Sequence, residues 1–245
     1  MVQILILREL KARYRGTALG FLWSFVNPLV LMVVYVWVFS VYFRVDMEHY
    51  SVFLLSGILP WNCFSSGLNE ATNSIISNGG LIKKVYLPSE MFPLVYVASN
   101  MVHYLLSIPI LLLFLIFFGI KLSWPLLFFP WILSIQLLFT YGLALIVSSL
   151  AVQFRDLLHV VPNFLMIWFF VTPILYPVGM VPERYRPVVK FNPMAQLITA
   201  YQDMFFSNRI PSMASLMILT GLSVAFLAIG LAVFGARRDV FAEEV

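Results

Sequence analysis

Six stretches of this chain are apolar, lack charged side chains and are long enough to cross a bilayer as helices. A hydrocarbon core about 30 Å thick needs about 20 helical residues. The stretches cover residues 20–43, 51–69, 91–120, 122–154, 157–181 and 210–236. They are continuously apolar, whereas the strands of a membrane β-barrel alternate apolar and polar residues. We therefore predict an all-α membrane protein with six transmembrane helices.

The composition excludes a soluble fold. Hydrophobic residues make up 62% of the chain and charged residues 11%, compared with roughly 25% charged residues in soluble domains. Mean hydropathy is +0.95. The first stretch follows several cations, as a signal peptide does, but it is too long and no small-residue cleavage site follows it. We expect it to remain as the first span.

The Lys and Arg residues indicate how the spans are oriented. Six spans place both termini on one side, and nine of the fifteen Lys and Arg lie on that side. These nine are Arg8, Lys11, Arg13, Arg15, Lys83, Lys84, Arg155, Arg237 and Arg238. The other six are Arg44, Lys121, Arg184, Arg186, Lys190 and Arg209. Because cytoplasmic loops are enriched in cations, both termini are predicted to be cytoplasmic, and the charge of +4 gives no reason to propose nucleic-acid binding.

Side chains that would hold a metal or a nucleotide are scattered or missing. The single cysteine, Cys63, excludes an intramolecular disulfide and a multi-thiolate site. His49, His103 and His159 lie on different segments without ligand spacing. No GxxxxGK[ST] loop is present to cradle ATP phosphates. We predict no metal and no cofactor on this chain, and we interpret Cys63 as a small buried apolar residue.

Residues 1–17 are too charged to span and are predicted to form an interfacial helix along the membrane surface. Leu7, Leu10 and Tyr14 share one helical face, while the neighbouring cations can extend to lipid headgroups. The segment is either a plain topology anchor or a cytoplasmic entrance for an acidic lipid-linked substrate. The cations of such an entrance are Arg8, Lys11, Arg13 and Arg15.

Residues 71–88 form the longest polar stretch on the predicted cytoplasmic side. An asparagine and two glycines favour a sharp turn, and apolar residues beside two lysines follow. This pattern is typical of a short helix that docks on a cytoplasmic partner, and an ordinary loop is the alternative. The candidate docking residues are Asn78, Gly79, Gly80, Leu81, Ile82, Lys83 and Lys84. Glu70, at the membrane edge just before them, is costly unless paired or hydrated and is a further functional candidate.

Residues 176–209 are predicted to form a bent, re-entrant gate at the outer mouth, before the last span. Pro173, Pro177 and Gly179 break the end of the fifth stretch, and Asn192 with Pro193 forms an N-cap and first-turn pair. The helix that follows carries a stripe at amphipathic spacing and is too polar to cross. The stripe comprises Met194, Leu197, Ile198, Tyr201, Met204 and Phe205, and the candidate gate residues are Tyr185, Pro193 and Tyr201.

Aromatic side chains recur on one face of the first stretch and one face of the fifth. These faces comprise Met32, Tyr35, Phe39 and Tyr42 in the first, and Phe169, Thr172 and Tyr176 in the fifth. Aromatic rings can meet the weakly positive C–H faces of sugars without the fixed hydrogen bonds that would stop a polymer from sliding. The faces therefore indicate either a sugar-lined path or bundle packing with an interfacial aromatic belt.

Several short motifs run along the chain. They are RELKARYR at 8–15, LGFLW at 19–23, NPL at 27–29, LIKKVYLP at 81–88, FRD at 154–156, TPILYP at 172–177 and NPM at 192–194. In combination they resemble the permease subunits of ABC-2 type exporters for O-antigen, capsule and teichoic acid polysaccharides. The resemblance covers nearly the whole chain, as a single ABC-2 type transmembrane domain of residues 1–245.

This resemblance implies a homodimer in the cytoplasmic, or inner, membrane. Each permease would pair with a separate cytoplasmic ATP-binding cassette subunit. The two copies of that subunit would bind ATP and Mg. The segment 71–88 would couple to the ATPase, the first and fifth spans would line the path, and 176–209 would gate the outer mouth. The implied cargo is a lipid-linked polysaccharide, first an O-antigen for lipopolysaccharide biosynthesis, then capsule or teichoic acid, and last a small molecule.

Two functions of other classes stay open on the residues alone. A membrane enzyme acting on polyprenyl-phosphate sugars would need clustered acids, histidines or a metal site, and Glu70, Asp156 and Asp203 are scattered. A passive channel would conduct in a bilayer without any partner.

Overall fold

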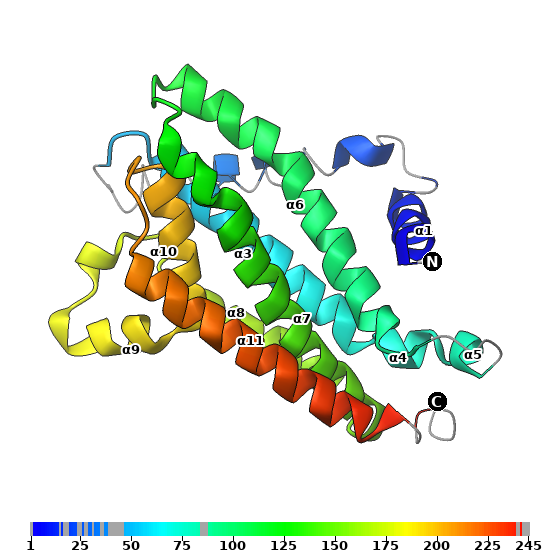
Figure 1. Ribbon diagram of the computed structural model, residues 1–245. Helices are drawn as coiled ribbons and strands as arrows, with labels where there is room; N and C mark the ends of the chain where they lie inside the picture. The colour runs from blue at the N-terminus through cyan, green and yellow to red at the C-terminus, as the bar shows by residue number, and fades with distance from the viewer. Residues whose placement is uncertain are drawn as a thin grey trace.

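The computed structural model describes residues 2–14, 16, 20–23, 26, 29–30, 32–34, 37–38, 47–83, 88–238 and 241. Every regular element in these ranges is a helix, and the long helices pack side by side (Figure 1). The elements are α1 (Val2–Tyr14), η1 (Gly20–Leu22), α3 (Tyr50–Thr72), α4 (Ser74–Ser77), α5 (Gly79–Ile82), α6 (Met91–Phe117), η2 (Trp124–Phe128), α7 (Phe129–Gln153), α8 (Leu157–Val171), η3 (Val178–Met180), η4 (Glu183–Tyr185), α9 (Arg186–Phe191), α10 (Pro193–Phe205) and α11 (Met213–Gly235).

Four of the predicted spans are present as long apolar helices. They are α3, α6, the continuous η2–α7 unit Trp124–Gln153, and α11. The first predicted stretch, 20–43, lies mostly outside the described residues. The fifth differs from the prediction because α8 has 15 residues, about 22 Å at 1.5 Å per residue. Pro173 explains where α8 ends, since a residue before proline is driven out of the helical region, and Thr172 is extended, with φ −97° and ψ 133°.

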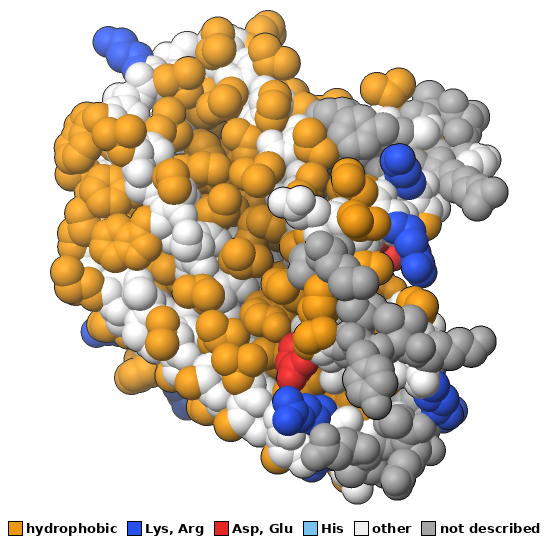
Figure 2. Space-filling model, turned by 45° about the vertical axis from the view of Figure 1, so that its right-hand side comes forward, with side chains coloured by type: hydrophobic (Ala, Val, Ile, Leu, Met, Phe, Trp, Pro, Cys, Tyr) orange, Lys and Arg blue, Asp and Glu red, His pale blue; other side chains and the backbone are white. Residues whose placement is uncertain are grey.

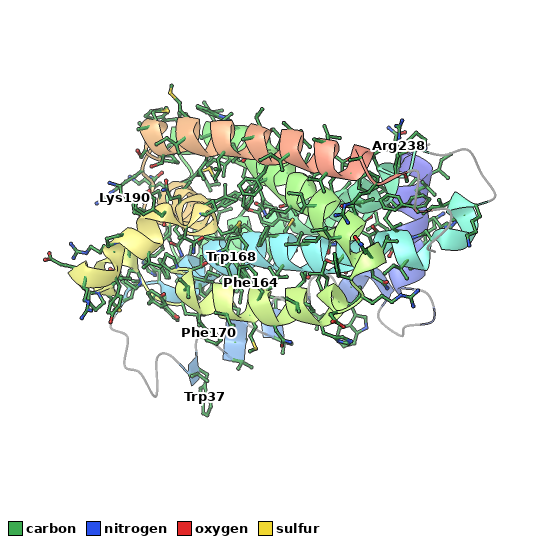
Figure 3. The ribbon with its side chains drawn as sticks, turned by 90° about the horizontal axis from the view of Figure 1, so that it is seen from below. Trp37, Phe164, Trp168, Phe170, Lys190 and Arg238 are labelled. Carbon is green, nitrogen blue, oxygen red and sulfur yellow. The ribbon has the colours of Figure 1, made fainter. Side chains whose placement is uncertain are left out.

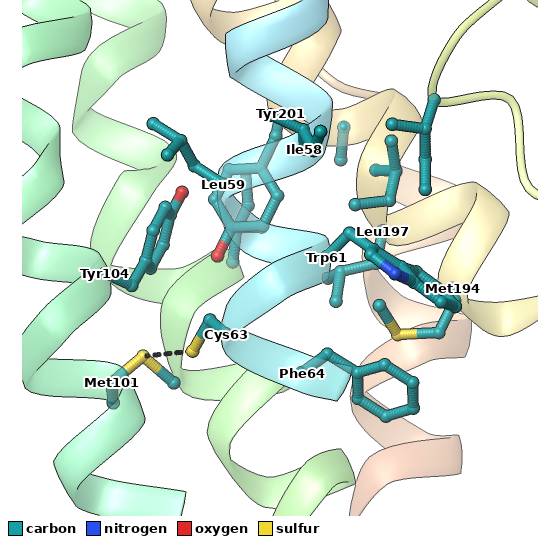
Figure 4. Packing of buried hydrophobic residues seen from close by; sticks show 14 of the residues in the cluster. Ile58, Leu59, Trp61, Cys63, Phe64, Met101, Tyr104, Met194, Leu197 and Tyr201 are labelled. Carbon is teal, nitrogen blue, oxygen red and sulfur yellow. Dashed lines mark hydrogen bonds between the residues drawn. The ribbon is translucent and has the colours of Figure 1, made fainter. Parts of the chain in front are cut away.

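Helix α3 is the centre of the bundle, and α11 lies at its periphery. The most apolar window of α3 is 78% buried, compared with 22% for α11, because α3 packs against α6, α7, α8 and α10. Cys63 of α3 is buried, as predicted, with its Sγ 4.0 Å from the Met101 Sδ (Figure 4). One face of the molecule presents a broad hydrophobic area with Lys and Arg at its edges (Figure 2), as expected of a surface that meets lipid.

The two ends of the molecule differ in what they carry. Helices α1, α4 and α5 and the end of α11 lie at one end, and α9 lies at the other (Figure 1). Arg238 and Lys190 mark these opposite ends (Figure 3). At the first end, the Arg237 guanidinium donates to Gln153 Oε1 at 2.8 Å, and Arg238 Nη1 lies 4.0 Å from Glu90 Oε1. The described ends of the chain are thus on the same side of the bundle.

Helices α7 and α11 cross at a contact between two glycines. A Cβ placed on Gly142 would lie 2.6 Å from the Leu227 backbone nitrogen, and a Cβ on Gly230 would collide with the Gly142 carbonyl oxygen. Small residues let helix backbones approach closely, which is how helices associate in lipid. Gly221 and Gly235, on the same helix α11, have no neighbour that a Cβ would meet within 4 Å.

Gly230→Ala is expected to destabilise the protein by about 1–3 kcal/mol, because the methyl group overpacks a backbone contact. Gly221→Ala is the matched control and should change stability by less than about 1 kcal/mol. Thermal unfolding in detergent, followed by intrinsic tryptophan fluorescence, measures both. Equal melting temperatures for the two variants would contradict the glycine contact.

Candidate functional site

A groove of about 450 Å³ runs between α3 and α8. We name it the α3–α8 groove. Its lining comprises Ile58, Trp61, Asn62, Ser65, Ser66 and Asn69 of α3 with Pro162, Leu165, Met166, Phe169 and Phe170 of α8. One wall therefore offers hydroxyl and amide groups, and the other offers aromatic and apolar surface. This combination suits a sugar, which has hydroxyl groups at its edge and C–H groups on its faces.

The polar wall was not among the residues predicted from sequence. Asn62, Ser65, Ser66 and Asn69 occupy positions i, i+3, i+4 and i+7, so they fall on one face of α3. All four are at least partly exposed, whereas the rest of α3 is buried except for Ser51 and Glu70 near its ends. That spacing within an apolar stretch is the signal of a polar helix face in the sequence, and the burial of the rest of α3 shows that this face is a groove wall.

The aromatic wall includes one of the residues predicted to line a path. Phe169 is half-buried, and its ring centroid lies 5.7 Å from that of Trp61. Trp168 also faces α3 (Figure 3), where its ring packs edge-on against Phe64 at 5.3 Å. Tyr176 lies beyond the end of α8 and donates its hydroxyl to the Phe170 carbonyl at 2.9 Å. Of the first-stretch residues, Met32 is buried in the core, whereas Tyr35, Phe39 and Tyr42 lie outside the described residues.

Asn192 joins the end of α8 to the start of α10. Its Oδ1 accepts from the Met194 and Ala195 backbone N–H groups at 3.0 and 3.2 Å, as an N-cap does. The same oxygen accepts from Trp168 Nε1 at 2.8 Å. Its Nδ2 donates to the hydroxyl of Thr172 at 3.1 Å. The predicted helix start at Asn192 and Pro193 is confirmed, and Thr172, predicted to line a path, is buried in this junction.

The non-helical backbone after α8 is buried, and side chains satisfy its carbonyl groups. The Gln202 amide donates to the Pro173 carbonyl at 3.0 Å, and the Tyr50 hydroxyl donates to the Leu175 carbonyl at 2.8 Å. Gly57 leaves room for the Gln202 amide, because a Cβ there would lie 2.9 Å from Gln202 Nε2. Irregular backbone at membrane depth is tolerated where protein groups satisfy it in this way.

Helix α10 is anchored to the bundle by its apolar stripe. All six predicted stripe residues are buried, so the amphipathic prediction is confirmed. Tyr201, a predicted gate residue, donates its hydroxyl to Gln136 Oε1 at 2.8 Å, and Gln136 Nε2 donates to the Pro60 carbonyl at 2.8 Å. The Tyr201 ring packs edge-on against Tyr104 (Figure 4). Of the other predicted gate residues, Pro193 begins α10 and Tyr185 is exposed.

The segment predicted to dock on a partner consists of the two short helices α4 and α5. Asn78 lies between these two helices, and its side-chain amide donates to the Ser74 carbonyl at 2.8 Å. Ile75 is fully buried in a cluster with Phe92, Phe234 and Phe241. The cluster also includes Leu145 and Val152 of α7, so it fixes one side of the segment to α6, α7, α11 and the last described residue of the chain.

The other side of this segment is exposed. Gly80 and Lys83 are exposed, Gly79 is buried, and Leu81 and Ile82 are half-buried against the same cluster. Lys84 lies outside the described residues. The exposed backbone around Gly80 offers open space, since a Cβ there would meet no atom within 4 Å.

The predicted entrance cations lie partly on α1, which packs against α6. Arg8 and Lys11 are exposed. A crevice brings Arg8 together with Asn78 and Tyr96, from three segments far apart in sequence. The side chain of Arg13 and the whole of Arg15 lie outside the described residues. Glu70 is paired close by, since the Asn100 amide donates to its Oε2 at 2.7 Å.

Comparison with known proteins assigns the family. Residues 1–206 match the family model described as ABC-2 type transporter. The chain belongs to the ABC-2 type transporter family. The O-antigen export system permease protein RfbA of Myxococcus xanthus is 39% identical over 243 residues, covering 98% of this chain and 94% of the relative. RfbA of Klebsiella pneumoniae is 35% identical over 239 residues, covering 96% and 91%. The polysialic acid transport protein KpsM of Escherichia coli is 24% identical over 253 residues, covering 97% and 93%.

As a member of a transporter family, this ABC-2 chain is a transport permease and not an enzyme. Its membership of this family places ATP hydrolysis in a separate subunit. The Asn192 junction lies at one end of α8, the helix that forms one wall of the α3–α8 groove.

Asn192→Ala is expected to cost about 1–3 kcal/mol of stability, because it removes a helix cap and leaves the Trp168 indole N–H without its acceptor. Asn163→Ala on exposed α8 surface removes only a bond to the His159 carbonyl and is the control. Thermal unfolding measures the cost, and limited proteolysis of residues 176–192 reports the loosened junction. Unchanged stability and proteolysis in Asn192→Ala would show that the junction is not needed.

Proposed function

We propose that this chain is the permease subunit of an ATP-driven exporter that moves a lipid-linked O-antigen polysaccharide across the cytoplasmic membrane. The observation that carries the proposal is the full-length similarity to an O-antigen export permease, 39% identical over 98% of this chain. Capsule exporters are more distant, as the 24% identity to the polysialic acid transport protein indicates. The α3–α8 groove supports a carbohydrate cargo because it combines polar and aromatic walls.

The proposed assembly is a homodimer with two cytoplasmic ATP-binding cassette subunits. Six spans complete each permease, with the first in residues 20–43 and the fifth made by α8 together with buried residues 172–175. The end that carries α1, α4, α5 and the C-terminal residues faces the cytoplasm, in agreement with the excess of cations there. The segment 71–88 couples to the ATPase, and 176–209 gates the outer mouth.

In this proposal the cargo follows the α3–α8 groove. Arg8 and Lys11 attract the acidic lipid carrier at the cytoplasmic end, where α1 exposes both side chains. Phe169 and the predicted first-span aromatics give sugar rings an apolar surface, while Ser66 and Asn69 exchange hydrogen bonds with hydroxyl groups. Each of these side chains makes only a single, exposed hydrogen bond with the polysaccharide, so the polymer can pass without being held in a deep binding site.

Ser66→Trp is expected to abolish most polysaccharide export, because the indole fills the α3–α8 groove. The measurement is surface polymer in a strain whose own copy of this chain is deleted, with internal polymer assayed in parallel. Ser134→Trp on exposed α7 surface is the control and should restore export. If Ser66→Trp exports normally while remaining in the membrane, the groove is not the path; if the deletion strain makes no polymer at all, the chain acts in synthesis.

Gly80→Leu is expected to abolish co-purification with the ATPase subunit. A Cβ at this position would meet no atom within 4 Å, so lost binding reports a partner in that space. Gly179→Leu, in η3 of the proposed outer gate, also adds a Cβ that meets no atom within 4 Å and should leave the complex intact. Retained ATPase in both variants would remove the proposed coupling role of the segment, and a wild-type chain that binds no ATPase and conducts alone would indicate a channel.

A further inference from the structure

A second and larger cavity, of about 940 Å³, lies between α9, α10 and the start of α11. We name it the α9–α11 cavity. It is at the end of the molecule opposite to the described chain ends (Figure 1), and it shares no lining residue with the α3–α8 groove. Its volume is typical of a ligand site, for which the range is about 300–1,000 Å³. Export of a polymer through the groove leaves this cavity without a role.

The lining of the α9–α11 cavity changes from apolar to polar. Val189, Ala195 and Ala200 are buried apolar residues of its wall, and Ile218 of α11 is 64% exposed on the surface that meets lipid. Hydroxyl groups of Ser212 and Ser215 line the start of α11. Such a lining fits an amphipathic molecule whose chains lie along α11 and whose headgroup enters the cavity.

Charges of both signs line this cavity. Arg186 Nη1 donates to Glu183 Oε1 at 3.3 Å, so these two charges offset each other. Lys190 and Asp203 remain, and neither makes an ion pair with another residue in the described part of the chain. The pKa of Asp203 is raised, because the effect of burial outweighs that of Arg209, which lowers the pKa. A half-buried carboxylate of this kind is stabilised by a cation that donates a hydrogen bond.

We propose that the α9–α11 cavity binds the headgroup of a phosphatidylethanolamine molecule from the surrounding bilayer. Lys190 donates to its phosphate, Asp203 accepts from its ammonium group, and its acyl chains lie along the Ile218 side of α11. A purely anionic headgroup would be repelled by Asp203, and a choline headgroup has no N–H to donate. The proposed orientation makes this an outer-leaflet site, but lipid binding itself requires neither cargo nor ATP.

The test is a lipid titration of the purified permease–ATPase complex followed by native mass spectrometry. Dioleoyl lipids with ethanolamine, choline and glycerol headgroups are compared. We expect the ethanolamine lipid to bind about fivefold more tightly than the others, and Lys190→Gln or Asp203→Asn each to remove most of that difference. Arg184→Gln is the control, because Arg184 is an exposed cation of η4 that lies over the Tyr185 ring and outside the cavity lining.

Two results would overturn the proposal. Equal or tighter binding of the anionic glycerol lipid would show a simple anion site, and undiminished ethanolamine selectivity in both variants would place the lipid elsewhere. The headgroup comparison on the unaltered chain keeps the test decisive if a variant misfolds. Lys190→Arg, which retains the donor charge, should bind the ethanolamine lipid like the wild type.

Discussion

The structure depends on the satisfaction of backbone hydrogen bonds in a segment that is not a helix yet is buried. In a bilayer an unpaired N–H or C=O group costs several kcal/mol, and the Thr172-Pro173 sequence ends α8 inside the protein. The carbonyls of Pro173 and Leu175 accept hydrogen bonds from Gln202 and Tyr50. These side chains come from α10 and α3, so ending α8 early requires those two helices to be in place.

The same requirement makes α10 part of the bundle, although α10 does not run the length of the bundle. Tyr201 reaches Gln136 of α7, and Gln136 reaches the carbonyl of Pro60 in the middle of α3. Pro60 lies inside α3, and the Gln136 bond to its carbonyl links α7 to the middle of that helix. Together with the cap at Asn192, these bonds tie the proposed outer gate to the central helix, and displacement of one strains the other.

Local signals in the sequence predicted much of this fold, but they could not predict which residues of different helices contact each other. Four of the predicted apolar stretches are long helices. Helix α10 begins at the Asn192–Pro193 pair, as expected, because helix caps and helical periodicity depend on residues that are near one another in the sequence. Pro173 also signals the early end of α8, although the stretch 157–181 as a whole predicts a span. The match of Gly142 with Gly230 joins residues far apart in sequence. The partly exposed polar face of α3 had a helical spacing, but only burial of the rest of α3 distinguishes a groove wall from a core helix.

The distribution of packing indicates which wall of the α3–α8 groove can move. Within α8 only Val161 and Leu165 are buried, whereas α3 is enclosed by four helices. At one end α8 follows a tight turn from α7, and at the other it meets the Asn192 junction. In the proposed exporter, a push on α4 passes through the Ile75 cluster to α6, α7 and α11, and of these α6 and α7 pack against α3. A rigid α3 wall and a lightly packed α8 wall, attached at its two ends, give a groove that widens by motion of α8 without rupture of the core.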